Sequence, residues 1–324
     1  MQARLVDERA LDLTSPRVLG AAVGENLGRV VRGKASAIEL ALVALLSGGH
    51  LLIEDVPGQG KTLLAKALAR SVGGAFGRVQ ATPDLLPNEL TGVSVFSTRS
   101  ERWEFRPGPL FANVVLVDEV NRATPRTQSA LLEAMEERQV SVDGVTHPLP
   151  SPFFLVATQN PFDHAGTFPL VEGQRDRFAL VLELGHPPRL AERELLLGTG
   201  GNDSLETLEA VTTPAQLADA IAVVHALHCA PAVADYIVEI GARTRSHPDV
   251  RLGASPRAAL GLLHAAKARA AMAGRAFVLP DDVKALAPCV LAHRLLLTGG
   301  PDLRTAAALV RTVLDVVPVP RVGG

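Results

Sequence analysis

The chain has 324 residues, of which 47% are hydrophobic and 20% charged, a composition typical of globular and not of disordered proteins. A net charge of −2 and a pI of about 6.5 give no sign of a protein that binds nucleic acid or an anionic membrane through bulk charge. No apolar run approaches the length of a bilayer span, no secretory leader is visible, and the two cysteines are far apart. We therefore expect a reduced, cytoplasmic protein with no membrane span and no nucleic-acid partner.

The first part of the chain predicts an α/β domain. Residues 1–28 are expected to form an N-terminal arm, and the α/β domain is expected over residues 29–187. The apolar spacing predicts a helix over residues 35–46, which two glycines end. Residues 50–54 (HLLIE) then predict a short buried strand, followed by a glycine-rich turn and another helix. Strand, glycine turn and helix in this order are the context that a phosphate-binding loop needs.

The glycine turn over residues 58–62 (GQGKT) carries the strongest chemical signal in the chain. Glycines let the backbone curl so that its N–H groups point at phosphate oxygens, and the following helix adds its positive N-terminal end. Lys61 is predicted to reach the β- and γ-phosphates of ATP, and Thr62 to hold Mg²⁺. Asp55 stands where the usual pattern has its first glycine. The predicted nucleotide-binding residues are Asp55, Val56, Pro57, Gly58, Gln59, Gly60, Lys61, Thr62 and Leu63.

An inserted hairpin and a second buried strand come next. Residues 91–107 alternate in polarity, which predicts the hairpin, and the apolar run over residues 111–120 predicts a parallel strand that ends in two carboxylates. Asp118 is predicted to hold Mg²⁺, and Glu119 to polarise the attacking water as a general base. A strand that ends in Asp–Glu is by itself more often a solvated strand end, so the preceding phosphate-binding loop is what favours the catalytic interpretation.

Three further elements complete the predicted α/β domain. A helix is expected from Pro125 to Arg138, and a second hairpin over residues 139–147. Buried strands are expected over residues 153–158 and 178–184. Asn160 follows the first of these strands and could lie close to the γ-phosphate, although an Asn that only starts a turn is equally consistent with the sequence.

The pattern becomes almost wholly helical near residues 186–190, which predicts a smaller all-α domain over residues 188–324. Arg177 lies just before the last predicted strand, and Arg257 lies in the first turn of a predicted helix of the second domain. Arginine keeps its charge and binds phosphate through two hydrogen bonds, which suits transition-state stabilisation. A surface ion pair is nevertheless the usual role of an arginine, and without further context the sequence favours that role for both Arg177 and Arg257.

Together these motifs resemble the MoxR family of AAA+ ATPases over nearly the whole chain. The segments that carry the resemblance are GGHLLIEDVPGQGKTLLAKALA, TPDLLPNELTG, FRPGPLFANVVLVDEVNRATPRTQSALLEAMEERQVSVDG, FFLVATQNP, GTFPLVEGQRDRF and GASPRAAL. The resemblance implies an α/β fold, in which an AAA+ P-loop parallel-sheet sandwich precedes a smaller all-α helical lid domain. It also implies that Asp55 at the first glycine position is this family's own variant.

The resemblance assigns roles that spacing alone does not. It implies that Asn160 is sensor 1 and that Arg177 is the finger acting on the ATP of the neighbouring subunit. It also implies that Arg257 is the sensor 2, which binds the nucleotide from the lid of the same chain. The Walker motifs are matched by Gly58, Gly60, Lys61 and Thr62, and by Asp118 and Glu119; the adenine-side loop is matched by Gly33 and Lys34. Arg175 departs from the family's usual sequence and leaves open which arginine reaches across the interface.

The function that the resemblance implies is hydrolysis of ATP to ADP and phosphate, with Mg²⁺, in a homo-oligomeric ring that we expect to be a hexamer. The expected work is chaperone-like remodelling or activation of partner proteins with a von Willebrand A domain. Two alternatives stay open, namely a magnesium-chelatase-like motor subunit and a non-catalytic nucleotide-binding scaffold. A scaffold would be expected to lose Glu119, Asn160 or Arg177, and the chain keeps all three.

Overall fold

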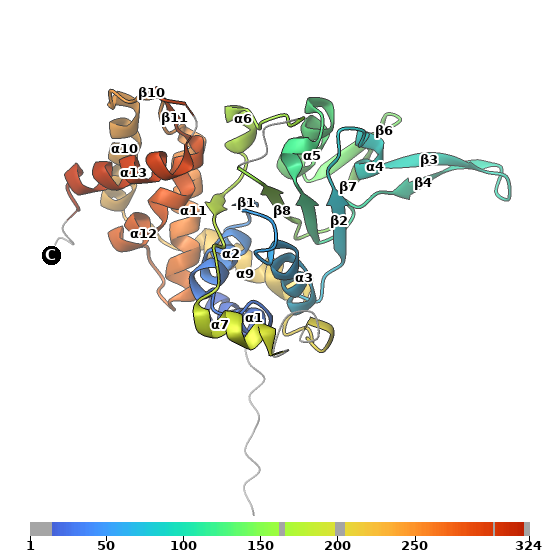
Figure 1. Cartoon of the computed structure of the whole chain (residues 1–324), viewed down its shortest axis with the longest axis horizontal. Helices are drawn as coiled ribbons and strands as arrows, with labels where there is room; N and C mark the ends of the chain where they lie inside the picture. Colours follow the sequence, from blue (N-terminus) through green and yellow to red (C-terminus); the bar gives the residue numbers. More distant parts are fainter. Residues whose placement is uncertain (1–14, 162–165, 198–204, 301, 321–324) are drawn as a thin grey trace, which may run out of the picture.

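The computed structural model describes residues 15–161, 166–197, 205–300 and 302–320, and its central element is a parallel sheet (Figure 1). Five strands of these ranges form the sheet in the order β2-β5-β8-β1-β9. In that order the strands are Phe76–Gln80, Val114–Asp118, Phe154–Gln159, Leu51–Glu54 and Leu180–Leu182. All neighbours pair in parallel, so the carboxyl ends of the strands share one edge of the sheet and the amino ends share the other.

The strands differ from the sequence prediction in two ways. The predicted strands over 111–120 and 178–184 are shorter in the structure, because β5 pairs with β2 and β8 only from Val114 onwards and β9 pairs with β1 only from Leu180 to Leu182. Strand β2 was not predicted at all. It is an edge strand, and only Gly77 and Val79 of its five residues are buried. Gly77 fits there because a Cβ at this position would lie 2.2 Å from the carbonyl oxygen of Pro109.

Alternate residues of the strands enter two hydrophobic cores, one on each face of the sheet. Ile53 and Leu116 belong to the larger core, and Leu52 and Val115 belong to the smaller one. The larger core is covered by α1 (Pro16–Val30), α2 (Ala35–Leu46) and α3 (Lys61–Ser71), and the smaller one by α4 (Pro87–Thr91) and α5 (Pro125–Glu137). Burial on both faces explains the nearly continuous apolar runs of the central strands.

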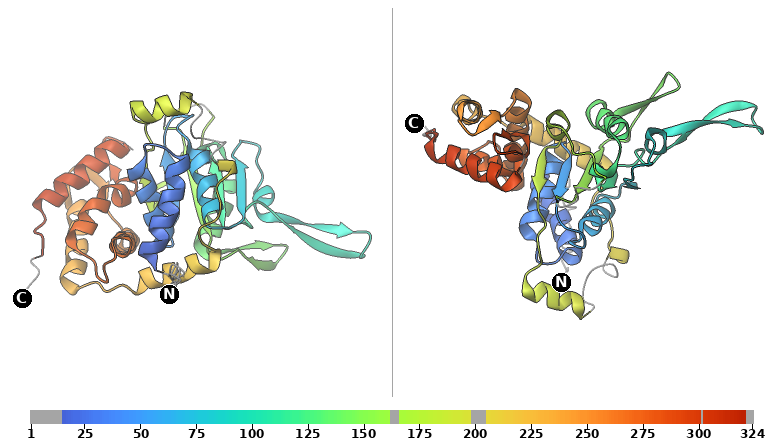
Figure 2. Two further views of the ribbon diagram at one scale, coloured as in Figure 1. Left: turned by 90° about the horizontal axis from the view of Figure 1, so that it is seen from below. Right: turned by 45° about the horizontal axis from the view of Figure 1, so that its top comes forward.

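Two antiparallel hairpins project from the core on the side away from the C-terminal helices (Figures 1 and 2). The first pairs β3 (Gly92–Ser97) with β4 (Arg102–Pro107), and the second pairs β6 (Gln139–Val142) with β7 (Val145–Pro148). Both were predicted from alternating polarity. Between them, α5 begins at the predicted N-cap, where the hydroxyl of Thr124 accepts a hydrogen bond from the amide of Thr127.

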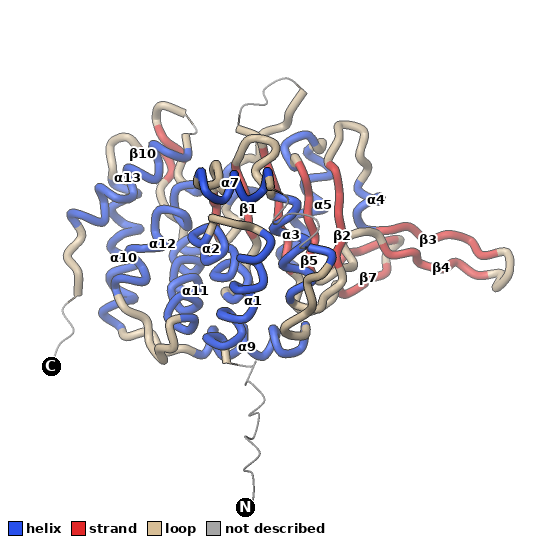
Figure 3. The backbone as a smooth tube through the Cα atoms, turned by 60° about the horizontal axis from the view of Figure 1, so that its bottom comes forward, coloured by secondary structure: helices blue, strands red, loops and turns tan. Residues whose placement is uncertain are grey.

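The C-terminal part of the chain is helical, as predicted. After the short α6 (Glu172–Arg175), its elements are α7 (Arg189–Leu196), α9 (Pro214–Ala226), α10 (Pro231–Ser246), α11 (Pro256–Met272), α12 (Pro280–Leu291), α13 (Leu303–Val316) and the strand pair β10 (Val250–Leu252) and β11 (Leu296–Leu297). The helices α10–α13, called the lid helices below, stand together beside the β9 edge of the sheet (Figure 3). None of the described helices combines the length and apolarity needed to cross a bilayer.

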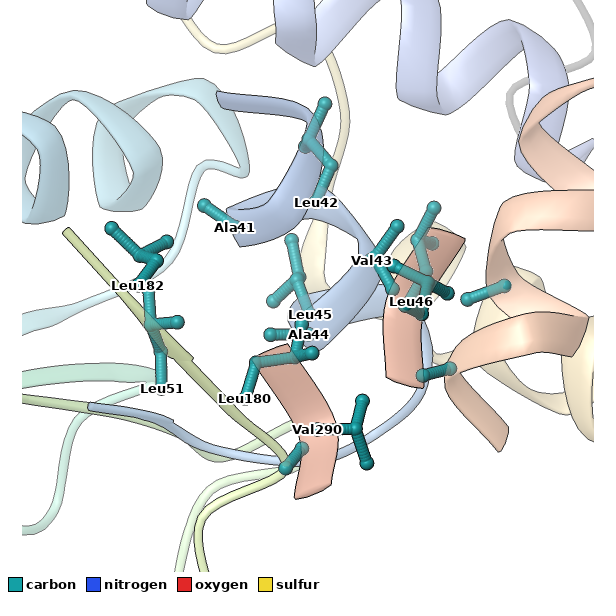
Figure 4. Packing of buried hydrophobic residues seen from close by; sticks show 14 of the residues in the cluster. Ala41, Leu42, Val43, Ala44, Leu45, Leu46, Leu51, Leu180, Leu182 and Val290 are labelled. Carbon is teal, nitrogen blue, oxygen red and sulfur yellow. The ribbon is translucent and has the colours of Figure 1, made fainter. Parts of the chain in front are cut away.

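The lid helices and the sheet share one core through α2. Leu45 and Leu46 of α2 belong to the same buried cluster as the strand residue Leu180 and the lid residue Val290 of α12 (Figure 4). The helices α1 and α9 pack on this same group, and α1 occupies the second half of the expected N-terminal arm. Residues 1–14 of that arm lie outside the described residues.

Candidate functional site

The glycine-rich loop, Glu119 and Asn160 all lie at the carboxyl edge of the sheet. β8 lies between β5 and β1, and the three strands are parallel. The glycine-rich loop follows β1, Glu119 follows β5, and Asn160 follows β8. Residues that follow the carboxyl ends of adjacent parallel strands come together, which is where open α/β sheets bind their ligands.

The glycine-rich loop has an open concave backbone. Gly58 and Gly60 have φ of +85° and +89°, the left-handed region that favours glycine, and Gly60 is the N-cap of α3. A Cβ at either glycine would meet no described atom within 4 Å, so it is the positive φ and not crowding that favours glycine at both positions. Lys61 and Thr62 are the first two residues of α3, and Nζ of Lys61 donates to the carbonyl of Asp55 at 2.7 Å. Such a loop at a helix N-terminus fits a phosphate group.

Asp55 ties this loop to the segment that leaves the sheet after β9. One of its carboxylate oxygens accepts from the amide of Val56 at 2.8 Å, and the other accepts from the amide of Gly185 at 2.7 Å. Nζ of Lys34 donates to the carbonyls of Gln59 and Gly185, both at 2.7 Å. Burial lowers the pKa of Lys34, and the nearby Asp55 carboxylate opposes that shift. These contacts give Asp55 a structural reason to occupy the position of a glycine, a reason that the sequence did not show.

The predicted adenine-side residues Gly33 and Lys34 lie against the same segment. Gly33 has φ of +73°, and a Cβ there would lie 2.7 Å from Cδ of Pro188 and 2.8 Å from Cβ of Ala191. This close approach requires glycine. The structure therefore places both residues beside the glycine-rich loop and next to the start of α7.

Side chains from β2 and from the residues after β5 hold the carboxylates of Asp118 and Glu119. Nε and Nη2 of Arg78 contact Oδ2 of Asp118 at 3.1 and 3.0 Å. Oε2 of Glu119 accepts from the amide nitrogen of Gln80 and pairs with Nε of Arg122, both at 3.1 Å. Glu119 has φ of +56°, a strained conformation for a residue with a side chain, and its amide donates to Oγ1 of Thr158 at 2.9 Å. Arg78 and Gln80 were missed because they lie on β2, the strand that the sequence did not predict.

Arg175 lies inside its own subunit. Its Nη2 pairs with Oε1 of Glu54 at 3.2 Å, and the two side chains are only 16% and 9% exposed. Burial raises the pKa of Glu54, and the charge of Arg175 opposes this. Gln159 also donates to the same carboxylate oxygen. Arg175 is thus bound to Glu54 at the end of β1 and largely buried, whereas the side chain of Arg177 is 31% exposed.

Arg177 and Arg257 lie together at the amino edge of the sheet, opposite the glycine-rich loop. Both bind the carboxylate of Glu136 in the last turn of α5: Nε of Arg177 donates to Oε2 at 2.8 Å, and Nη2 of Arg257 donates to Oε1. They border a cavity of about 420 Å³ that Gly48, Gly49 and His50, the residues before β1, also line. The expected position of Arg257 at the nucleotide of its own chain therefore differs from the structure, in which Arg257 lies on Glu136 at the other edge of the sheet.

The lid helices are fixed to the sheet at this same edge. Nε of Arg294 pairs with Oδ1 of Asp176 at 3.0 Å, and its Nη2 donates to the carbonyl of Phe178 at 2.8 Å. Oγ of Ser255 donates to the same Asp176 carboxylate at 3.2 Å. Burial lowers the pKa of Arg294 to about 10, while the Asp176 charge opposes the shift. These contacts join the lid to the segment before β9 and so bring Arg257, two residues after Ser255, close to Arg177.

Comparisons with known proteins agree with this geometry. The family model described as "ATPase family associated with various cellular activities (AAA)" matches residues 50–180, and the model described as "AAA lid domain" matches residues 242–313. The protein YeaC of Bacillus subtilis is 46% identical over 94% of this chain and 95% of its own length. The chaperone MoxR1 of Mycobacterium tuberculosis is 41% identical over 91% of this chain and 80% of its own. The crystal structure of a candidate ATPase from Cytophaga hutchinsonii superposes with a TM-score of 0.87 at 33% identity, covering 96% of this chain and 97% of that one.

Proposed function

The chain belongs to the MoxR family of AAA+ ATPases, with an AAA+ α/β fold and a helical lid, and from this membership we propose that it hydrolyses ATP to ADP and phosphate. The observation that carries the proposal is the meeting of the glycine-rich loop, Glu119 and Asn160 at one edge of the sheet. An open anion-binding loop beside a carboxylate is what hydrolysis of a phosphoanhydride requires.

Each residue of this edge has a role in the proposal. The amides of the loop from Asp55 to Leu63 and Nζ of Lys61 bind the phosphates, while Gly33 and Lys34 border the adenine side. Glu119 accepts the proton of the attacking water, and Asn160 orients the γ-phosphate from the neighbouring strand. Gln80 and Arg122 both contact Oε2 of Glu119 and so orient its carboxylate.

The residues at this edge also fit a Mg²⁺ ion. Thr62 offers a hydroxyl at the start of α3, and Asp118 offers a carboxylate at the end of β5, and such hard oxygen ligands are what Mg²⁺ prefers. When bound, Mg²⁺ neutralises charge on the phosphates of the nucleotide. Arg78 now contacts one oxygen of Asp118, and Oδ1, 3.4 Å from the Thr158 hydroxyl, is the oxygen turned away from that arginine.

The positions of the arginines support hydrolysis between subunits. Arg177 and Arg257 lie at the edge opposite their own glycine-rich loop, so we infer that both act on the ATP of a neighbouring copy in a homo-oligomeric ring, which we expect to be a hexamer. A contact between two different edges of identical subunits is head-to-tail and closes into a ring when the rotation allows it. Arg177 is the better candidate for the finger because Arg175 is engaged with Glu54.

We further propose that the ATPase cycle serves a chaperone-like remodelling or activation of partner proteins in the cytoplasm. The name of one relative, chaperone MoxR1, supports a chaperone role. The family resemblance favours clients with a von Willebrand A domain. The hairpin β3–β4 projects from the core and exposes 71% of Trp103, which offers an apolar side chain to a client (Figure 2).

The test compares three purified proteins. The unmodified chain is expected to release phosphate from Mg-ATP, whereas Glu119→Gln should bind ATP with unchanged affinity and lose turnover, because the general base is gone while the loop is intact. Lys61→Ala should abolish nucleotide binding. Wild-type turnover by Glu119→Gln would refute the general-base role. An ATP-locked Glu119→Gln protein, used as bait, should retain client proteins that Lys61→Ala does not.

A further inference from the structure

Glu136 binds two arginines, Arg177 from the α/β domain and Arg257 from the lid. Glu136 lies in the last turn of α5, a helix of the α/β domain. Arg257 lies in the first turn of the lid helix α11, and Arg177 lies just before β9. Oε2 of Glu136 accepts from Arg177, and Oε1 accepts from Arg257. The two guanidinium groups are therefore held side by side on one carboxylate.

Arg177 and Arg257 are the cations of this cavity that can still reach outward. The cavity of about 420 Å³ is also lined by Arg138 and Arg294, whose guanidinium groups donate to the carbonyls of Gly48 and Phe178 and are mostly buried. By contrast the side chains of Arg177 and Arg257 are 31% and 48% exposed. Arg177 uses Nε for Glu136 and Nη1 for the carbonyl of Gly173, and Arg257 uses Nη2 for Glu136. These hydrogen bonds do not use Nη2 of Arg177 or Nε and Nη1 of Arg257.

The charges of the cavity also suit a phosphate. Four arginines, Arg138, Arg177, Arg257 and Arg294, face two carboxylates, Glu136 and Asp176, with His225 and His264 on the same wall. Asp176 is engaged by Arg294 and Ser255. Hydrogen bonds from Arg177 and Arg257 lower the pKa of Glu136, so its carboxylate stays ionised and attractive to both guanidinium groups.

We propose that Glu136 is a positioning residue for hydrolysis in the neighbouring subunit: it holds Arg177 and Arg257 as one pre-oriented pair that receives the γ-phosphate of that subunit's ATP. The inference rests on the proposed ATPase function. Two guanidinium groups close together repel each other, and the carboxylate between them offsets that repulsion and restricts their rotamers. Removing it leaves both arginines in the protein but no longer in one arrangement.

The test uses Glu136→Ala and, in case alanine loosens the lid, Glu136→Gln, which keeps the size of the side chain. We expect the kcat of Glu136→Ala to fall roughly 10- to 100-fold, the cost of misplacing catalytic groups by about 1 Å. The kcat of Glu136→Gln should fall less than that of Glu136→Ala. The affinity for ATP should not change, because the glycine-rich loop lies at the other edge. Glu137→Gln, the adjacent exposed carboxylate of α5, is the matched control and should retain wild-type turnover.

Mixing of subunits separates a positioning role from a structural one. Glu136→Ala subunits keep an intact loop and general base, and Glu119→Gln subunits keep an intact arginine pair. Rings that contain both should therefore regain turnover that neither protein has alone. Wild-type kcat in both Glu136 variants, or no recovery on mixing, would overturn the role of Glu136 while the ATPase function stands. An unmodified protein without ATPase activity would overturn both.

Discussion

The two edges of the parallel sheet carry different sets of residues, which the proposed mechanism joins in one reaction. The carboxyl edge holds an open glycine loop and carboxylates, whereas the amino edge holds Arg177, Arg257 and Glu136. A complete site needs both halves, and one strand length separates them within a single chain. The separation of the two sets within one chain is what favours the proposed action of Arg177 and Arg257 on the site of another copy.

The edges also differ in how firmly their groups are held. At the amino edge, Arg294 and Asp176 lock the lid helices to the sheet through buried contacts. At the carboxyl edge, Arg78 contacts Oδ2 of Asp118, and Gln80 and Arg122 contact Oε2 of Glu119. These contacts are made by partly exposed side chains, whereas Arg294 at the amino edge is almost fully buried.

The largest expected effect that separates the edges is that of Arg177→Ala. Loss of an arginine finger costs about 10³- to 10⁵-fold in turnover in related NTPases, so kcat should fall into that range while ATP affinity stays near wild type. Phosphate release and fluorescent-nucleotide binding measure the two quantities. Arg175→Ala is the contrasting variant: it leaves Glu54 buried without its cation and should lower the melting temperature. A loss of turnover confined to Arg175→Ala would move the finger to that residue.

Arg257→Ala should behave like Arg177→Ala with a smaller loss, about 10- to 100-fold in kcat, because it supplies one charge-assisted contact of a pair. Mixing it with Glu119→Gln subunits should restore turnover, since the arginine then comes from the partner. Arg251→Ala, an exposed arginine of β10, is the control on the lid. Failure of the mixture, together with weakened ATP binding by the variant itself, would show that Arg257 serves the nucleotide of its own chain.

The smallest effect is expected for Asp55→Asn at the carboxyl edge. The change weakens one of two charge-assisted hydrogen bonds, to Val56 or Gly185, and removes the charge partner of Lys34. We expect a loss of about 1–2 kcal/mol in the free energy of unfolding. A roughly three- to tenfold weaker affinity for ATP should accompany it, because about 0.7–1.4 kcal/mol of binding is lost with the loop's anchor. Asp219→Asn, an exposed carboxylate of α9, is the control, and an equal effect of both variants would contradict the anchoring role.

Local chemistry made much of the fold predictable. The helix over residues 35–46, both hairpins, the N-caps Thr124 and Ser255 and the strand–glycine–helix order follow from short-range patterns, and the structure has them. The lid helix α12 shows the limit of such reasoning, since Leu279 is a poor N-cap by its own chemistry. There the Asp282 carboxylate, three residues on, accepts from the amide of Leu279 at 2.9 Å and serves instead.

By itself, the sequence determined the glycine-rich loop, the carboxylates after β5 and the two-part organisation, because each depends on residues that are close together in the chain. Only the tertiary structure decided that β2 brings Arg78 and Gln80 to those carboxylates, and that Asp55 and Lys34 meet at Gly185. It also decided that the lid presents Arg257 beside Arg177 on Glu136. These contacts join residues that are far apart in sequence, and their geometry is set by how the strands and lid helices pack, which no local pattern encodes.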